Sequence, residues 1–219
     1  MSPHLDDAVF SAGARLVSHV RAGDDVTVLT CLTGNVERPE GFALACQLDK
    51  GLPPTADYMA LRRAEDRAAC SVIGATAIHW DFLEAPHRGY ADAASLFAAA
   101  RPDDGLTGAL ADAFVDHFEH ARYDRIYGPW GVGDHVDHVA VRSALEAAVD
   151  DIVWWEDFPY AMREPASPDA IVRRAAEPVS LERKIEAALC YVTQIPFQFG
   201  SPKQARAALS QWRAEGFSR

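Results

Sequence analysis

The chain has 219 residues, and 21 Lys and Arg stand against 32 Asp and Glu, which gives a formal net charge of −11. Its length fits one domain over residues 1–219 that buries a core without disulfides. The negative charge disfavours nucleic acid and other polyanions as partners. No signal peptide and no apolar run of the ~18 residues that a membrane span needs is recognisable. The four cysteines lie far apart, so we expect reduced thiols in a cytoplasmic protein.

Helix-like and strand-like segments alternate along the chain. Apolar residues at three- and four-residue spacing predict helices at Ala8–Arg21, Tyr58–Ile73, Leu106–Arg122, Val136–Val149, Leu181–Gln194 and Pro202–Glu215. Short apolar or β-branched runs predict strands at Val26–Leu32, Ala77–Phe82, Arg125–Gly128 and Ile152–Trp155. The segment Asn35–Asp57 is predicted as a long loop that can include a short helix, and Pro159–Pro178 as a loop.

This alternation favours an α/β fold of Rossmann-like type. We expect a mostly parallel sheet with helices on both faces, in three layers α/β/α. In such sheets ligands bind beyond the carboxyl ends of the strands, so the loops that follow the strands should carry the chemistry. The least patterned segments, Asn35–Asp57, Phe82–Tyr90 and Glu156–Pro178, are expected to form the wall of the pocket.

The first cluster of chemically active side chains lies where the first predicted helix begins. His4, Asp6 and Asp7 fall within four residues, and His4 and Asp7 are spaced so that both can face one metal ion. Asp6 then points elsewhere and is free to act on a water molecule. The alternative is that Asp6 and Asp7 only cap the helix and interact favourably with its dipole.

The second cluster, Asp134–His138, follows the third predicted strand and a Gly-rich turn. His135 and His138 lie on one side of a helix start, and the two clusters can meet at one edge of a parallel sheet. His4, Asp7 and one of these two histidines then supply the three protein ligands of a catalytic zinc site. A site of this composition also accepts Fe²⁺, Co²⁺ or Ni²⁺.

In combination the two clusters resemble the PIG-L/LmbE-like family of zinc-dependent de-N-acetylases. The two family motifs read Ser2-Pro3-His4-Leu5-Asp6-Asp7 and His135-Val136-Asp137-His138 in this chain. Further similarity lies in Arg62-Arg63-Ala64-Glu65, in Asp81-Phe82-Leu83 with Arg88, and in Glu156-Asp157-Phe158-Pro159-Tyr160. The resemblance therefore covers nearly the whole chain.

The resemblance implies a role for each matched residue. His4, Asp7 and His138 would bind zinc, and Asp6 would act as the general base. His135 would stabilise the oxyanion or donate a proton, and Asp137 would orient His135. Arg62 would contact the sugar, with Arg63 as a lesser candidate. Arg88, Trp130 and Tyr160 are further candidates for substrate binding, and a structural role is the alternative for each.

The function implied by the resemblance is hydrolytic removal of an N-acetyl group from an N-acetylglucosamine-containing small molecule or glycoconjugate. One alternative is an amidase that acts on a different N-acyl amino sugar or conjugate in antibiotic or thiol metabolism. Another is a non-catalytic Rossmann-like binding module, although no Gly-x-Gly-x-x-Gly motif supports a dinucleotide. The expected partner is a small amino-sugar substrate. Assembly of the chain into a homo-oligomer is neither predicted nor excluded.

The start of the sequence differs from what the resemblance implies. Family members carry a buried strand directly before the His-x-Asp-Asp motif, whereas only Met1-Ser2-Pro3 precede it here. A missing strand would expose a sheet edge and leave His4 and Asp7 near a frayed terminus. We therefore expect that Met1 is not the natural start and that a chain extended at its N-terminus binds zinc more tightly.

Overall fold

The computed structural model describes residues 1–163, 166 and 170–218. The helices are α1 (Asp7–Ala22), α2 (Gly41–Asp49), α3 (Tyr58–Ile73), α4 (Leu106–His120), α5 (Val136–Ala148), α6 (Pro178–Ala188), α7 (Ile195–Phe199) and α8 (Pro202–Gln211). The strands are β1 (Thr27–Thr30), β2 (Thr76–His79), β3 (Ile126–Pro129), β4 (Ile152–Trp155), β5 (Ile171–Ala175) and β6 (Ala214–Ser218). No helix in these residues is both long and apolar enough to cross a membrane.

The strands form two separate sheets. β1 and β2 pair in parallel, and β3, β4, β6 and β5 follow one another in the second sheet. β3 and β4 are parallel, whereas β6 runs antiparallel to both β4 and β5. Beside β1, Ser2 forms an isolated parallel bridge with Thr30.

The predicted α/β architecture is thus confirmed, but the prediction of one mostly parallel sheet is only partly right. β5 lies in the segment Pro159–Pro178 that was predicted as a loop, of which 164–165 and 167–169 are outside the described residues. β6 overlaps the end of the predicted helix Pro202–Glu215, since α8 already stops at Gln211. Both strands are short and carry charged residues or glycine, so they lack the β-branched apolar pattern that marks a buried strand.

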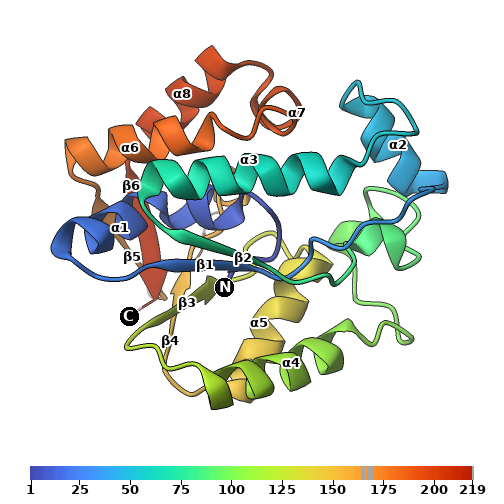
Figure 1. Cartoon of the computed structure of the whole chain (residues 1–219), viewed down its shortest axis with the longest axis horizontal. Helices are drawn as coiled ribbons and strands as arrows, with labels where there is room; N and C mark the ends of the chain where they lie inside the picture. Colours follow the sequence, from blue (N-terminus) through green and yellow to red (C-terminus); the bar gives the residue numbers. More distant parts are fainter. Residues whose placement is uncertain (164–165, 167–169, 219) are drawn as a thin grey trace.

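Helices cover the strands on both sides (Figure 1). On one side α1, α3 and α6 pack together around a core that includes Phe10, Val28 and Tyr191. On the other side α4 and α5 enclose a second core that includes Leu29 and Phe114. The two groups of helices therefore lie on opposite sides of the strands.

Glu215 connects the last strand both to α6, through a buried ion pair, and to α1, through hydrogen bonds. Lys184 on α6 donates to Oε1 of Glu215 on β6 at 2.8 Å, and both side chains are almost completely buried. Glu215 also accepts the backbone N–H groups of Ala14 and Arg15 in α1, at 2.8 and 2.9 Å. Gly13 makes room for this contact, because a Cβ atom there would lie 2.9 Å from the Lys184 side chain. Glu215 therefore satisfies three buried donors at once.

Replacing Glu215 with Gln should destabilise the protein by about 3–5 kcal/mol, because Lys184 would remain buried without a counter-charge. The free energy of unfolding, measured by urea denaturation, tests this. Glu182→Gln is the matched control: its ion pair with Arg206 is half exposed, so the loss should stay below about 1 kcal/mol. Equal effects of the two substitutions would contradict the assignment.

Candidate metal centre

The first part of the site is a tight turn between the N-terminal residues and α1. The Ser2 hydroxyl donates to the carbonyl of His4 at 2.7 Å and accepts the N–H of Ala8 at 3.1 Å. The backbone N–H of His4 donates to Oδ2 of Asp7 at 2.9 Å. These bonds fix the turn, so His4 and Asp7 are held at the start of α1 with both side chains on one side.

The second part of the site lies between β3 and α5. Asp157, which follows β4, accepts the N–H groups of Gly131 and Val132 at 2.7 and 2.9 Å and so shapes the Gly-rich turn. His135 caps α5, and its Nδ1 accepts the N–H of Asp137 at 3.2 Å. The first turn of α5 then places His138 against the turn that carries Asp7.

Three side chains come together with the spacing of metal ligands. Oδ2 of Asp7 lies 3.1 Å from Nδ1 of His4 and 3.2 Å from Nε2 of His138. In tetrahedral zinc sites, bond lengths of about 2.0–2.1 Å separate neighbouring ligand atoms by roughly 3.3 Å. The predicted combination of His4, Asp7 and His138 is therefore one that can hold a single ion.

The fully buried Nε2 atom of His138 supports this site. It has no hydrogen-bond partner among the described residues. Nδ1 of the same ring donates to Oδ1 of Asp157 at 2.8 Å, which leaves the lone pair on Nε2 facing the Asp7 carboxylate. Two acceptors that face each other in a buried place require a proton or a metal cation between them. The donor set of two imidazoles and one carboxylate suits zinc.

Each of the two histidines has a carboxylate on the far side of its ring. Nε2 of His4 lies 2.8 Å from Oδ2 of Asp137. Nδ1 of His138 likewise lies 2.8 Å from Oδ1 of Asp157. Carboxylates in this position fix the ring and raise its basicity as a ligand. The structure thus directs the side chain of Asp137 toward His4, whereas the sequence predicted that it orients His135. Asp137 contacts His135 only through its backbone N–H, which donates to Nδ1 of His135.

The electrostatics of the cluster favour positive charge. Burial alone lowers the pKa of a histidine, yet Asp137 and Asp7 hold the pKa of His4 well above its usual value. In the same way Asp7 and Asp157 overcome the effect of burial and raise the pKa of His138 to about 9. Burial would raise the pKa of Asp7, but the two histidines keep it well below its usual value. A metal ion would supply the positive charge that these groups favour.

Asp6 lies beside the ligands and has the properties of a base. Burial, together with the charge of Asp7, raises the pKa of Asp6 to about 7, while the guanidinium of Arg62 opposes this shift. Arg62 lies 3.8 Å from Oδ1 of Asp6 and forms an ion pair with Glu84. A carboxylate with a pKa near neutrality is suited to taking up and returning a proton.

His135 is a neutral donor at the same centre. Burial and the neighbouring charge of His4 lower the pKa of His135 to about 3, so its ring is uncharged near pH 7. Since Nδ1 accepts a backbone N–H, the ring proton is on Nε2. The ring packs edge to face against Phe97, with a centroid separation of 5.3 Å. A neutral imidazole held in this way donates a hydrogen bond from Nε2.

A cavity of about 350 Å³ opens onto these residues. Of the predicted substrate-binding residues, Arg62 and Tyr160 line it, and the ring of Tyr160 packs 5.2 Å from that of His138. Arg88 and Trp130 do not contribute to this lining. Arg88 instead contacts Asp104 and Asp137, each at 2.9 Å, and Trp130 stacks beneath Arg142.

Several residues of the site were not assigned a role from the sequence. Asp157 supports His138 and the Gly-rich turn. The sequence feature that could have identified it is an acidic residue soon after the predicted strand Ile152–Trp155. Glu84 pairs with Arg62, and it lies two residues after the predicted strand Ala77–Phe82. The apolar side of the cavity is formed by Phe42, Phe97 and Phe197, which come from three distant segments. No local pattern marks these aromatic residues as neighbours.

Asp157→Asn should weaken divalent metal binding by about 10–100-fold, because the charge that orients His138 is removed. Titration of the metal-free protein with Zn²⁺ measures this. Asp66→Asn is the control: Asp66 is equally buried and bonds His79 at 2.8 Å, but it does not touch the three ligands. A loss of affinity of the same size in both variants would show that the effect is not specific to the site.

Comparison with known proteins agrees with this geometry. The chain is 31% identical over 171 residues to 2'-N-acetylparomamine deacetylase of Streptomyces fradiae, which covers 76% of this chain and 58% of that protein. It is 31% identical over 162 residues to 1D-myo-inositol 2-acetamido-2-deoxy-alpha-D-glucopyranoside deacetylase of Mycobacterium sp. (strain KMS), covering 69% of this chain and 49% of that protein. The chain thus spans less than two thirds of the length of either relative.

A solved structure is also similar. The zinc-inhibited form of teicoplanin deacetylase Orf2 superposes with a TM-score of 0.86 at 27% identity, over 99% of this chain and 95% of that one. The model of the family PIG-L, GlcNAc-PI de-N-acetylase, matches residues 1–149, which include both metal-binding motifs. The chain therefore belongs to the PIG-L family of GlcNAc-PI de-N-acetylases.

Proposed function

We propose that this protein is a zinc-dependent hydrolase that removes the N-acetyl group from an N-acetylglucosamine-containing small molecule or glycoconjugate. The observation that carries the proposal is the buried site of His4, Asp7 and His138, with Asp6 beside it, at the floor of a cavity. Its volume of about 350 Å³ falls in the range of small-molecule sites.

His4, Asp7 and His138 would hold the metal, through Nδ1, Oδ2 and Nε2 respectively. When bound, a divalent zinc ion lowers the pKa of water and polarises an amide carbonyl. Three protein ligands leave a fourth position open, which is the arrangement of catalytic zinc sites. Asp137 and Asp157 keep the two rings oriented, so that the site is formed before substrate arrives.

Asp6 acts as the proton carrier in this proposal. As a carboxylate it takes the proton from the water that attacks the amide carbon, and it later returns that proton to the leaving amine. Acetate and a free amino sugar are the products. Arg62 keeps a share of Asp6 ionised at neutral pH, because its positive charge opposes the effect of burial.

His135 stabilises the negative charge that develops on the carbonyl oxygen. Its Nε2–H is available for this bond, because Nδ1 is already engaged by the backbone. A preorganised donor in a buried site is worth several kcal/mol at the transition state. Phe97 and Tyr160 pack against the ring and hold it in place.

The relatives support the choice of substrate class. The two curated deacetylases are named for an N-acetyl group on paromamine and for a 2-acetamido-2-deoxyglucopyranoside of myo-inositol. Both names describe an acetylated amine on a small polar molecule. An amidase for longer acyl chains is the competing function, since the aromatic residues of the cavity also provide an apolar surface.

A panel of N-acetylated and longer N-acylated amino sugars, followed by mass spectrometry with and without a chelator, tests the proposal. The wild type should release acetate from N-acetylated sugars, and the chelator should abolish this. Asp6→Asn should bind zinc as before but lose about 10²–10⁴-fold in rate. Asp134→Asn, an exposed neighbour of His135, is the control and should keep its activity.

Two outcomes would contradict the proposal. Wild-type rates in Asp6→Asn would show that Asp6 is not the base. A strong preference for long acyl chains would favour the competing amidase.

Arg62→Gln should shift the acidic limb of the kcat/KM profile to higher pH. The base must be ionised, so activity falls as the pH drops below its pKa. Removal of Arg62 takes away a positive charge that lowers the pKa of Asp6, so this pKa should rise by about 1 unit or more. Arg62→Lys keeps the charge and should leave the limb close to its original position. Identical profiles in all three proteins would contradict the electrostatic role of Arg62.

A further inference from the structure

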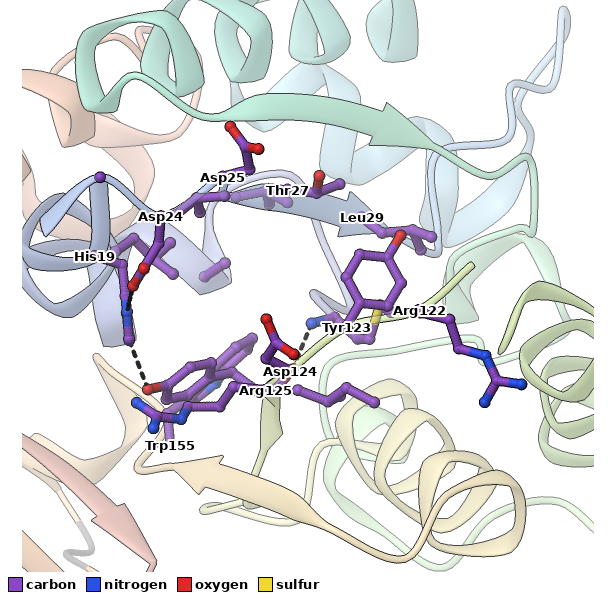
Figure 2. A pocket seen from close by; sticks show the side chains of 18 residues that line it. His19, Asp24, Asp25, Thr27, Leu29, Arg122, Tyr123, Asp124, Arg125 and Trp155 are labelled. Atoms are coloured by element: carbon purple, nitrogen blue, oxygen red, sulfur yellow. Dashed lines mark hydrogen bonds and ion pairs between the residues drawn. The ribbon is translucent and has the colours of Figure 1, made fainter. Parts of the chain in front are cut away.

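The cavities of the structure differ in the polar groups that they leave free for a ligand. Figure 2 shows a cavity of about 660 Å³ between β1 and β3, where Asp24 and Tyr127 engage the two ring nitrogens of His19 at 2.7 and 2.9 Å. The cavity of about 350 Å³ at the metal centre is lined by Gln194 and Tyr58. The proposed function makes no use of these two side chains, although they keep hydrogen-bonding groups free.

The side-chain amide of Gln194 is held in one orientation. Gln194 directly precedes α7 and is buried at the wall of the cavity. Its neighbour Thr193 donates its N–H and its hydroxyl hydrogen to the two carboxylate oxygens of Glu65, each at 2.8 Å. Because the hydroxyl hydrogen of Thr193 is used in this way, its oxygen can only accept. It accepts from Nε2 of Gln194 at 2.8 Å.

The second hydrogen of this amide is engaged as well. Nε2 of Gln194 donates to the hydroxyl oxygen of Tyr58, at the start of α3, at 2.8 Å. Oε1 accepts no hydrogen bond from the described residues, and it is not one of their fully buried side-chain atoms that lack a partner. It is therefore an acceptor of fixed direction that is open to the cavity.

Tyr58 supplies a donor next to this acceptor. Its hydroxyl oxygen accepts from Gln194, and its hydroxyl hydrogen has no acceptor among the residues that the structure describes. Burial raises the pKa of Tyr58 above its usual value, so the hydroxyl keeps its hydrogen near neutral pH. One free acceptor and one free donor thus lie on neighbouring groups of the cavity wall.

The charges around Tyr58 restrict what this pair can bind. The guanidinium carbon of Arg62 and Nζ of Lys50 each lie 5.5 Å from the centroid of the Tyr58 ring. An ammonium group of a ligand would be repelled by both cations. A carboxylate has no hydrogen to donate to Oε1 of Gln194. A neutral hydroxyl group, which donates one hydrogen bond and accepts another, matches the pair.

Arg62 connects this pair with the reacting centre. Its guanidinium contacts the ring of Tyr58 on one side and lies 3.8 Å from Oδ1 of Asp6 on the other. An N-acetylated sugar that presents its amide to Asp6 can therefore extend past Arg62 to Gln194 and Tyr58.

We propose that Gln194 and Tyr58 form a subsite for one hydroxyl group of the sugar, which donates to Oε1 of Gln194 and accepts from the Tyr58 hydroxyl. Glu65 and Thr193 are positioning residues, because their hydrogen bonds fix the amide of Gln194. The inference rests on the proposed function for the choice of an amino sugar as the ligand. It assigns selection of the sugar to residues outside the two metal-binding motifs.

Binding of methyl N-acetylglucosaminide to the zinc-loaded Asp6→Asn protein tests the subsite, because this variant should bind the sugar without hydrolysing it. Calorimetric titration compares this sugar with three analogues, each of which lacks the hydroxyl group at C3, C4 or C6. The four ligands are measured again after Gln194→Met or Tyr58→Phe is added to Asp6→Asn. Gln198→Met, one helical turn further along at the same cavity, is the matched control.

One of the three analogues should bind about 10-fold or more weakly than the parent sugar, because it leaves Oε1 of Gln194 and the Tyr58 hydroxyl without a partner. Gln194→Met and Tyr58→Phe should weaken binding of the parent sugar by a similar factor and remove most of this discrimination. Gln198→Met should keep the discrimination. If Gln194→Met does not fold, Tyr58→Phe, which keeps the ring, decides.

Unchanged discrimination in the variants of Gln194 and Tyr58, or no binding of any of the four sugars, would overturn the subsite. Acetate release by the wild type separates this result from the proposed function. Acetate release together with equal affinities for all four sugars would overturn the subsite alone. The expected affinities without acetate release would support the subsite and overturn the deacetylase function.

Discussion

The structure depends on a cluster of buried carboxylates that is stabilised by positive charge. Asp7, Asp137 and Asp157 surround the rings of His4 and His138, and these side chains are almost entirely shielded from water. Isolated carboxylates in such a place would be strongly destabilising. Because the histidines link these carboxylates and leave one lone pair free at the centre, binding of an ion and stability of this region are coupled.

The arrangement of the chain makes this centre possible. His4 and Asp7 follow the segment that pairs with β1, His138 follows β3, and Asp157 follows β4. Each of these residues follows the end of a strand or of a paired segment, which is the general location of ligand sites in α/β sheets. Asp157 serves two purposes there, since it fixes both a ligand ring and the turn that leads to it.

The sequence was sufficient for features that are local and repeated. The spacing within each motif pointed to His4, Asp7 and one of the two histidines, and the family resemblance implied that this histidine is His138. The structure brings these three side chains together, and apolar periodicity identified most helices. The sequence was insufficient where the direction of a side chain determines which residues it contacts. Arg88 and Trp130 lie close to the motifs but contact Asp104 and Arg142 instead of the cavity. β5 and β6 were missed because they are stabilised by long-range pairing and not by their own residue pattern.

The contact between Glu215 and α1 has a consequence for how the protein is made. It joins residues about 200 positions apart, from the helix that begins at Asp7 to a strand near the other end of the chain. At typical rates of synthesis α1 leaves the ribosome roughly 10–40 s before Glu215 does. During that interval two backbone donors in α1 lack this acceptor, and the ammonium of Lys184 lacks it only while the last 31 residues before Glu215 are made. The metal centre therefore gains its final support only after translation of β6, and it matures as one of the last parts of the fold.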